Sequence, residues 1–156
     1  MDLILWRHAD AVDAAPGESD FERALTGKGR TQTKRMAAWL NERLPADSIV
    51  MASPALRAQQ TAKALKRKII SSAALGTDTD CKTLLAAVRG PRAQSTTVVV
   101  GHQPALGHVA SWLLTGAVGE ISIRKGGVWW FRCAATRRHE RTVHAVLLAV
   151  MTPDLL

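Results

Sequence analysis

The feature that most constrains this chain is the alternation of short apolar runs with helical patterns over its first two thirds. Leu3–Trp6, Ser48–Ala52 and Thr96–Val100 have the length and composition of buried strands. A helical pattern follows the second run and extends to about residue 67. Apolar residues at helical spacing, from Leu106 to Leu114, follow the third run. This order predicts an α/β protein with a mostly parallel sheet and helices packed against it.

The remaining segments complete this expectation. Residues 9–25 show no clear period and predict a long loop over one end of the sheet. Thr26 is a typical N-cap for a helix that ends near Leu44, and a short helix is expected over Lys82–Val88. The tail predicts a meander of three strands: Ile121–Ile123, Val128–Cys133 and Val143–Met151. We expect residues 1–156 to form one domain.

Composition limits the class of protein. The chain has 156 residues, of which 47% are hydrophobic, which is enough for one core. The longest apolar run, Ala145–Met151, is far shorter than the roughly 20 residues that cross a bilayer. Because the first residues also lack the pattern of a secretory signal, we expect a cytoplasmic protein. Cys81 and Cys133 lie far apart without metal-type spacing and are expected to be buried thiols.

The charge favours anionic partners. Twenty-one Lys and Arg residues against thirteen Asp and Glu residues give a formal net charge of +8. Such a balance suits a nucleic acid, a phosphorylated small molecule or an acidic protein surface, and composition alone leaves these three open.

Basic and histidine side chains follow two of the predicted strands. Arg7 and His8 come directly after the first strand, and Gly101-His102-Gln103-Pro104 follows the third. Arg57 lies one turn into the helix after the second strand, so the three segments meet at one edge if the strands are parallel. Arginines and histidines beside helix N-termini are typical of a phosphate site. The glycine-rich fingerprints of nucleotide-binding proteins are absent from the sequence.

These segments together resemble the histidine phosphatase superfamily, also called phosphoglycerate-mutase-like. The motifs extend from residue 7 to residue 104, in the order and spacing of that family. They are Arg7-His8; Leu25-Thr26 with Gly29 and Gln32; Ser53-Pro54 with Arg57, Gln60, Thr61 and Ala62; and Gly101-His102-Gln103-Pro104. The short chain and the approach from Asp20 to Thr26 are most similar to the SixA branch, the protein phosphohistidine phosphatases.

The resemblance implies a three-layer α/β/α sandwich and roles for individual residues. His8 would be the nucleophile that carries the phosphoryl group, and Arg7, Arg57 and His102 would contact its oxygens. Arg23 and Lys28 are further candidates for phosphate binding. No metal or other cofactor is implied. The neighbouring guanidinium groups are expected to disfavour the imidazolium form of His8 and so keep it nucleophilic near neutral pH.

Two positions depart from the family pattern. Ala9 stands where the family usually has glycine, and we expect a small effect. The glutamate that donates a proton to the leaving group in many members has no evident match, because residues 68–95 contain only Asp78 and Asp80 as acids. Imidazole is a more readily protonated leaving group than an alkoxide, so this absence favours a P–N substrate. The acids of the first loop, Asp10, Asp13, Glu18 and Asp20, are candidate substitutes.

The resulting hypothesis is a metal-independent phosphatase that acts on phosphohistidine in a protein, such as an acidic phosphotransfer domain or carrier. The alternative on the same scaffold is a small-molecule phosphomonoesterase. A more remote alternative is a basic nucleic-acid-binding module, in which Arg7 and Arg57 contact backbone phosphates. We expect neither nucleic acid nor membrane as a partner.

Three local features have simpler interpretations than a functional one. Ser53 is interpreted as a helix cap rather than a nucleophile, because Pro54 beside it suits the first helical position. His108 lacks the spacing and the carboxylate of a zinc site and is interpreted as a surface or packing residue. The basic run 137–141 is interpreted as a solvated turn.

Overall fold

The computed structural model describes residues 1–88, 95–134 and 145–156. Within these ranges the strands are β1 Asp2–Arg7, β2 Ile49–Ala52, β3 Ile69–Ser71, β4 Thr97–Gly101, β5 Val128–Cys133 and β6 Ala145–Met151. The α-helices are α1 Gly27–Asn41, α2 Leu56–Lys63, α3 Cys81–Val88 and α4 Ala105–Thr115. Short 3₁₀ turns occur at Asp20–Glu22, Ala73–Leu75 and Pro153–Leu155. The four helices and the main strands lie close to where the apolar pattern predicts them.

The strands form one sheet in the order β3-β2-β4-β1-β5-β6. The pairs β2–β3, β2–β4 and β1–β4 are parallel, whereas β5 and β6 add to the β1 side as antiparallel strands. The central strand β4 is buried along its whole length, which its run of β-branched residues suits. The parallel strands therefore all end at the same edge of the sheet, and the loops that follow them meet there.

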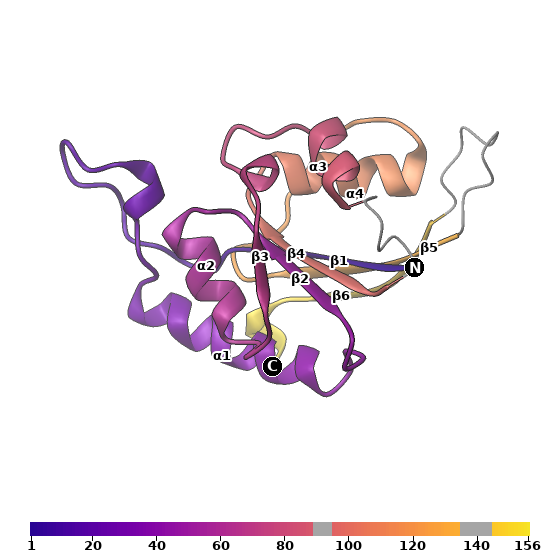
Figure 1. Cartoon of the computed structure of the whole chain (residues 1–156), viewed down its shortest axis with the longest axis horizontal. Helices are drawn as coiled ribbons and strands as arrows, with labels where there is room; N and C mark the ends of the chain where they lie inside the picture. Colours follow the sequence, from indigo (N-terminus) through magenta and orange to yellow (C-terminus); the bar gives the residue numbers. More distant parts are fainter. Residues whose placement is uncertain (89–94, 135–144) are drawn as a thin grey trace.

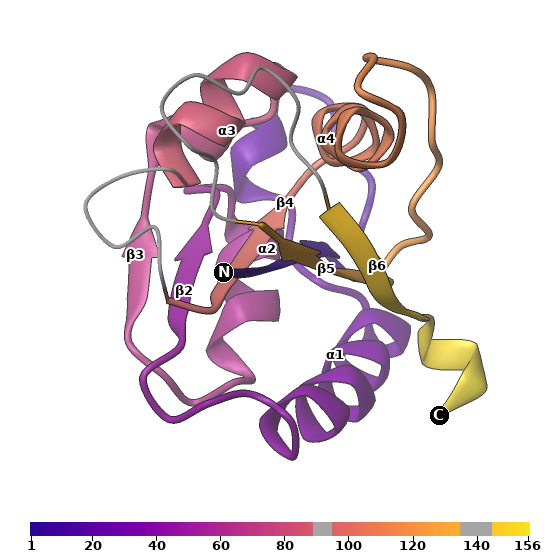
Figure 2. The ribbon, with the colours of Figure 1, turned by 90° about the vertical axis from the view of Figure 1, so that its right-hand side faces the viewer.

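Helices cover both faces of this sheet, which gives the three layers expected from the sequence (Figure 1, Figure 2). The helices α3 and α4 lie on one face, over a core that includes Leu5, Val99 and Phe131. The helices α1 and α2 lie on the other face, over a core that includes Trp6 and Val100. Alternate residues of β1 and β4 thus enter opposite cores, and the fold is a three-layer α/β/α sandwich.

The structure corrects three expectations about local elements. Ile121–Ile123 is not a strand; this segment is extended loop that brings the fully buried Ile123 into the core beneath α4. The helix after β2 begins at Leu56 and not at Pro54, with Ala55 as an N-cap that makes no side-chain bond. It ends at Lys63, and the chain then forms β3 at Ile69–Ser71, which the sequence pattern did not reveal because the strand has only three residues.

Two other expectations are confirmed. The Oγ1 atom of Thr26 accepts a hydrogen bond from the Gly29 amide at 2.9 Å, so Thr26 caps α1. Cys81 and Cys133 are buried free thiols. Among the described residues, none of the helices has both the length and the apolar character needed to cross a membrane. Val143 and His144, at the start of the last predicted strand, lie outside the described residues.

Candidate active site

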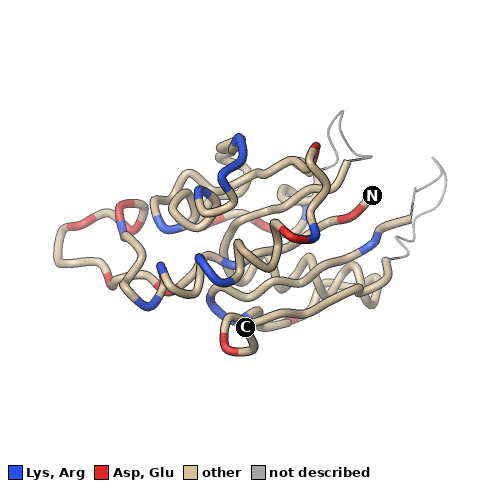
Figure 3. The backbone as a smooth tube through the Cα atoms, turned by 90° about the horizontal axis from the view of Figure 1, so that it is seen from below, with Lys and Arg blue, Asp and Glu red and all other residues tan. Residues whose placement is uncertain are grey.

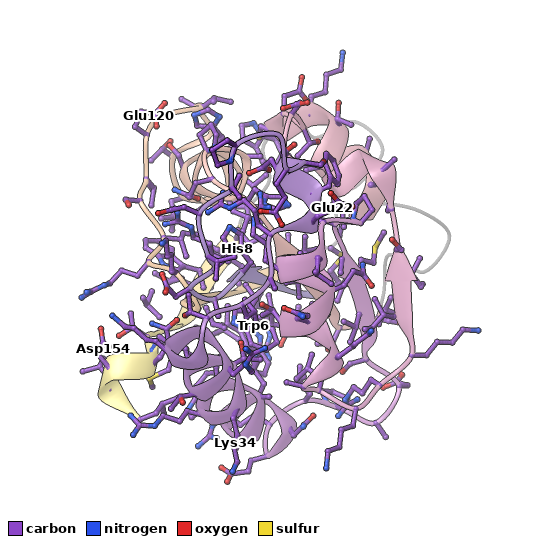
Figure 4. All side chains as sticks on the ribbon, turned by 90° about the vertical axis from the view of Figure 1, so that its left-hand side faces the viewer. Trp6, His8, Glu22, Lys34, Glu120 and Asp154 are labelled. Atoms are coloured by element: carbon purple, nitrogen blue, oxygen red, sulfur yellow. The ribbon has the colours of Figure 1, made fainter. Side chains whose placement is uncertain are left out.

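The predicted side chains converge at the edge where the parallel strands end. His8 follows β1, Ser53 follows β2 and His102 follows β4, while Arg57 reaches the same point from the first turn of α2. Figure 4 looks onto this end of the molecule and shows His8 near its centre, above Trp6 of strand β1. His8, Arg57 and His102 are all buried, with exposed fractions of 7%, 4% and 4%. The structure thus brings together residues that are almost fifty positions apart in the chain.

The neighbours of His8 select its tautomer. Its Nδ1 atom lies 2.8 Å from the carbonyl oxygen of Ala9, which can only accept a hydrogen bond, so Nδ1 carries the proton. Its Nε2 atom lies 3.4 Å from Nε of Arg57, which can only donate. The lone pair of neutral His8 is therefore on Nε2, facing the arginine and the second histidine.

His102 has the opposite arrangement of its two nitrogens. Arg57 approaches its Nδ1 atom at 3.5 Å, and its Nε2 atom lies 2.8 Å from Oγ of Ser53. Because the arginine can only donate, Nδ1 accepts, and Nε2 carries the proton that is donated to the serine. The rings of His8 and His102 are 5.1 Å apart between centroids and inclined at 53°. One guanidinium group thus contacts both imidazoles.

Burial keeps both histidines neutral. Burial first, and then the charges of Arg57, Arg7 and Arg23, lower the pKa of His8 to about 4 against the opposing bond to Ala9. Burial also lowers the pKa of His102 to about 3, with smaller contributions from His8 and Arg57. Desolvation is the largest cause in each case, and the cations that the sequence pointed to make smaller contributions. A neutral imidazole with a free lone pair is the form that attacks phosphorus.

Arg7 provides a second cation at this edge. One of its terminal nitrogens donates to the carbonyl oxygen of Ile123 at 2.8 Å, which fixes the direction of the side chain. Its Nε atom is buried and makes no hydrogen bond within the described part of the chain. Burial also lowers the pKa of the guanidinium. An unpaired buried donor costs free energy unless a ligand accepts its proton, so Arg7 is suited to an incoming anion.

Asp20 of the long loop lies directly on Arg57. Its backbone carbonyl oxygen and its Oδ2 atom accept hydrogen bonds from the two terminal nitrogens of Arg57, at 2.5 Å and 2.8 Å. Bonds from Arg23 and from Arg57 lower the pKa of the Asp20 carboxyl, so that it is ionised near neutral pH. The backbone carbonyl and one carboxylate oxygen of Asp20 thus occupy both terminal nitrogens of Arg57, which are donors that a phosphoryl group can also use.

Other motif residues hold the backbone around His8 and do not contribute charge. The Ala9 amide donates to the Thr61 hydroxyl, and the Asp10 amide donates to the Gln32 side chain. A Cβ atom at Gly29 would overlap the carbonyl oxygen of Asp10, so only glycine allows α1 to approach this closely. The methyl group of Ala9 is fully buried in a small cluster with Ala11 and Leu25.

The two further phosphate-binding candidates lie differently. Arg23 binds within its own loop, to the Asp20 carboxylate at 2.9 Å and to the Val12 carbonyl oxygen at 2.7 Å. Arg23 does not contact His8 directly in the described hydrogen bonds; Asp20, which binds both Arg23 and Arg57, connects it to the buried cluster. Lys28 is exposed and lines a hollow between α1 and the C-terminal 3₁₀ turn. None of its described contacts is with His8 or Arg57.

Other candidate acids and the surface histidine His108 have partners away from the buried cluster. Asp10 accepts hydrogen bonds from Lys125 and Thr26, and Glu18 from the Ala15 amide. His108 pairs with Glu120 at 2.9 Å on the surface. The run 137–141 lies outside the described residues. No group of three or more His, Cys, Asp or Glu side chains that could hold a metal ion occurs within 1–88, 95–134 and 145–156.

Sequence reasoning missed the part that Ser53 has in the cluster. Ser53 is fully buried, and its Oγ atom accepts from the Ala55 amide and from His102 instead of capping α2. The sequence contains a signal for this, because Ser53 directly follows a strand that ends at the same edge as β1 and β4. Asp20 was one of four candidate acids, and only its position in space distinguishes it from the others.

Comparison with known proteins agrees with this geometry. The family profile of the histidine phosphatase superfamily (branch 1) matches residues 3–76. An uncharacterized protein of Picosynechococcus sp. is 32% identical over 173 residues, which cover 100% of this chain and 99% of that protein.

Solved structures show the same fold. The protein histidine phosphatase SixA, in its complex with tungstate, is similar with a TM-score of 0.80 and 23% identity over 99% of both chains. A candidate phosphohistidine phosphatase SixA of Nakamurella multipartitia is similar with a TM-score of 0.77 and 26% identity, over 97% of this chain and 95% of that one. A phosphoserine phosphatase of Entamoeba histolytica, in complex with phosphoserine, has a TM-score of 0.70 and 15% identity over 99% and 98%. The chain belongs to the histidine phosphatase superfamily and is an enzyme of the phosphatase class.

Proposed function

We propose that this phosphatase removes the phosphoryl group from phosphohistidine in a protein, through a phosphorylated His8 and without a metal. The observation that carries the proposal is the buried cluster of His8, Arg57 and His102 beside Arg7, in which the Nε2 lone pair of His8 faces a guanidinium group. The SixA-type proteins that share the fold support the choice of phosphohistidine.

The chemistry has two transfers. In the first, Nε2 of His8 attacks phosphorus, the bond between phosphorus and the substrate nitrogen breaks, and the substrate imidazole leaves and takes a proton from water on that nitrogen. In the second, water attacks the phosphorus on His8, inorganic phosphate leaves and His8 returns to its neutral form. Arg7, Arg57 and His102 stabilise the charge that spreads over the equatorial oxygens. The Ala9 carbonyl keeps the proton on Nδ1, which preserves the nucleophilic nitrogen.

The state of Asp20 supports a nitrogen leaving group. Asp20 is the acid that contacts the cluster, and Arg23 and Arg57 hold its carboxyl ionised. An ionised carboxylate has no proton for an alkoxide, whereas an imidazole is protonated readily. The same argument ranks a small-molecule phosphomonoesterase second.

The test measures phosphate release in EDTA from a histidine-phosphorylated protein and from an alkyl phosphate ester. Preferential turnover of phosphohistidine that disappears in His8→Ala supports the proposal. Turnover of the ester alone would move the substrate to small molecules, and no turnover of either would favour a binding role.

A further inference from the structure

A groove of about 720 Å³ lies between α1 and α2, beside the candidate active site. Small apolar side chains, among them Ala37 and Ala64, form part of its lining. Four cations also line it: Arg30 and Lys34 from α1, Lys63 from the last turn of α2, and Lys66 from the turn after it. We refer to this feature as the α1–α2 groove. Figure 3 shows the molecule from the side on which α1 lies, with the basic positions in blue.

The charge of the groove is unbalanced. Its lining contains neither Asp nor Glu, and none of its four cations has an ion pair or a side-chain hydrogen bond within the described ranges. By contrast, Arg23, Arg43, Arg124, Lys125 and Arg132 all pair with a carboxylate. Arg30 and Lys34 are four residues apart on one helix, which is unfavourable for like charges. Part of the net charge of +8 is therefore concentrated where an anion can meet it.

One polar detail in the groove has no partner in the described part of the chain. Thr33 is 3% exposed, and its Oγ1 atom makes no hydrogen bond within the described residues. An unsatisfied buried hydroxyl calls for an explanation, and a bound ligand is one. Lys66 has a φ of 54° because it lies in the turn that ends α2, where its amide donates to the Lys63 carbonyl oxygen at 3.0 Å.

The groove is continuous with the active-site loop. Gln60 lines it, and its side chain accepts a hydrogen bond from the amide of Leu25, another lining residue. Gln60 is one helical turn after Arg57, which contacts His8. The Lys34 side chain is further along α1, on the outer surface of the molecule (Figure 4). A segment bound along the groove would thus begin close to the phosphoryl site.

We propose that the α1–α2 groove binds an acidic segment of the phosphorylated protein substrate and so selects among phosphohistidine proteins. Carboxylates of the segment pair with the four cations, and its small apolar side chains contact the alanines. A nucleic acid is the less suitable anion, because the lining offers no aromatic side chain for base stacking. This inference rests on the proposed function for the identity of the partner, and the charge and shape of the groove are independent of it.

The experiment compares Lys34→Glu with Lys82→Glu. Both residues are exposed helix positions without a described ion pair, but Lys82 lies on α3, on the opposite face of the sheet. The probes are two synthetic peptides with one phosphohistidine each, one with a run of Glu and the other with Gln in its place. We expect the kcat/KM ratio between the Glu and Gln peptides to fall about tenfold in Lys34→Glu and to stay at the wild-type value in Lys82→Glu.

Equilibrium binding gives a second readout that does not need catalysis. The unphosphorylated Glu peptide, followed by fluorescence anisotropy, should bind Lys34→Glu and Lys63→Glu about tenfold more weakly than Lys82→Glu. Equal effects of Lys34→Glu and Lys82→Glu, or no effect of either, would overturn the proposal that the groove binds an acidic segment. The proposal would also be overturned if single-stranded RNA bound more weakly to Lys34→Glu while binding of the Glu peptide was unchanged. If the wild type releases no phosphate from either peptide, the proposed function fails. The anisotropy measurement still decides whether the groove binds an acidic segment.

Discussion

The stability of the fold should fall between about pH 7 and about pH 5 because two histidines are buried in their neutral form. In the unfolded chain both imidazoles titrate near 6.5, whereas in the fold the pKa is about 4 for His8 and about 3 for His102. Between 6.5 and these lower values the unfolded chain binds more protons than the native one, so unfolding becomes easier as the pH falls. Between pH 7 and pH 5 the free energy of unfolding should fall by about 2 kcal/mol for each histidine and by about 4 kcal/mol for the pair.

The assay is urea unfolding of the wild type and of His102→Gln at several pH values in that window. The carboxyls whose pKa values are lowered, Asp2, Asp10, Asp20 and Asp80, titrate below 3.8 and change stability only at lower pH. The substitution should therefore remove about half of the loss, about 2 kcal/mol, whatever it does to stability near neutral pH. Equal pH dependence in the two proteins would refute the burial argument. An NMR titration of His8 with a midpoint near 6.5 would do the same.

Three substitutions test other parts of the site. Arg57→Lys keeps the charge but loses the planar donors that contact both histidines, so kcat/KM on phosphohistidine should fall about 100-fold or more, with the circular dichroism spectrum unchanged. Asp20→Asn removes the carboxylate that competes for Arg57; because that carboxylate is half exposed, calorimetry should show inorganic phosphate binding only about threefold tighter, with Asp13→Asn as the unchanged control. Gly29→Ala should cost about 2–4 kcal/mol in urea unfolding, because its Cβ meets the Asp10 carbonyl, whereas Gly27→Ala meets nothing within 4 Å and should cost little. A result in which both alanine variants are equally stable would contradict this account of the loop.

The sequence predicted the elements whose signal is local. A buried strand such as β4 is recognisable from five consecutive residues, and a polar side chain directly after it must lie at the edge of the sheet. For this reason the sequence alone predicts that His8, Arg57 and His102 approach one another. The cap of α1 by Thr26 was predictable on the same local grounds.

What the sequence could not supply depends on contacts between distant segments. Ser53 and Pro54 have the local chemistry of a helix start, but the bond between Ser53 and His102 directs the serine into the site, and α2 begins later. Ile121–Ile123 has strand-forming residues, yet the Ile121 and Ile123 carbonyls accept from Gln103 and Arg7 instead of from a neighbouring strand. Asp20 is indistinguishable from three other acids until the loop is folded against Arg57.

The motif contains two kinds of residue, and the difference explains why it is longer than the chemistry requires. Arg7, His8, Arg57 and His102 present charge and a nucleophile. Gln32, Gln60 and Thr61 instead bind the backbone amides of Asp10, Leu25 and Ala9, and Gly29 lets α1 approach that backbone. The tautomer of His8 depends on where the Ala9 carbonyl lies, so the second set acts on the nucleophile without touching it. A substitution in this set should therefore lower kcat by misplacing a proton acceptor, even though every charged group of the site is still present.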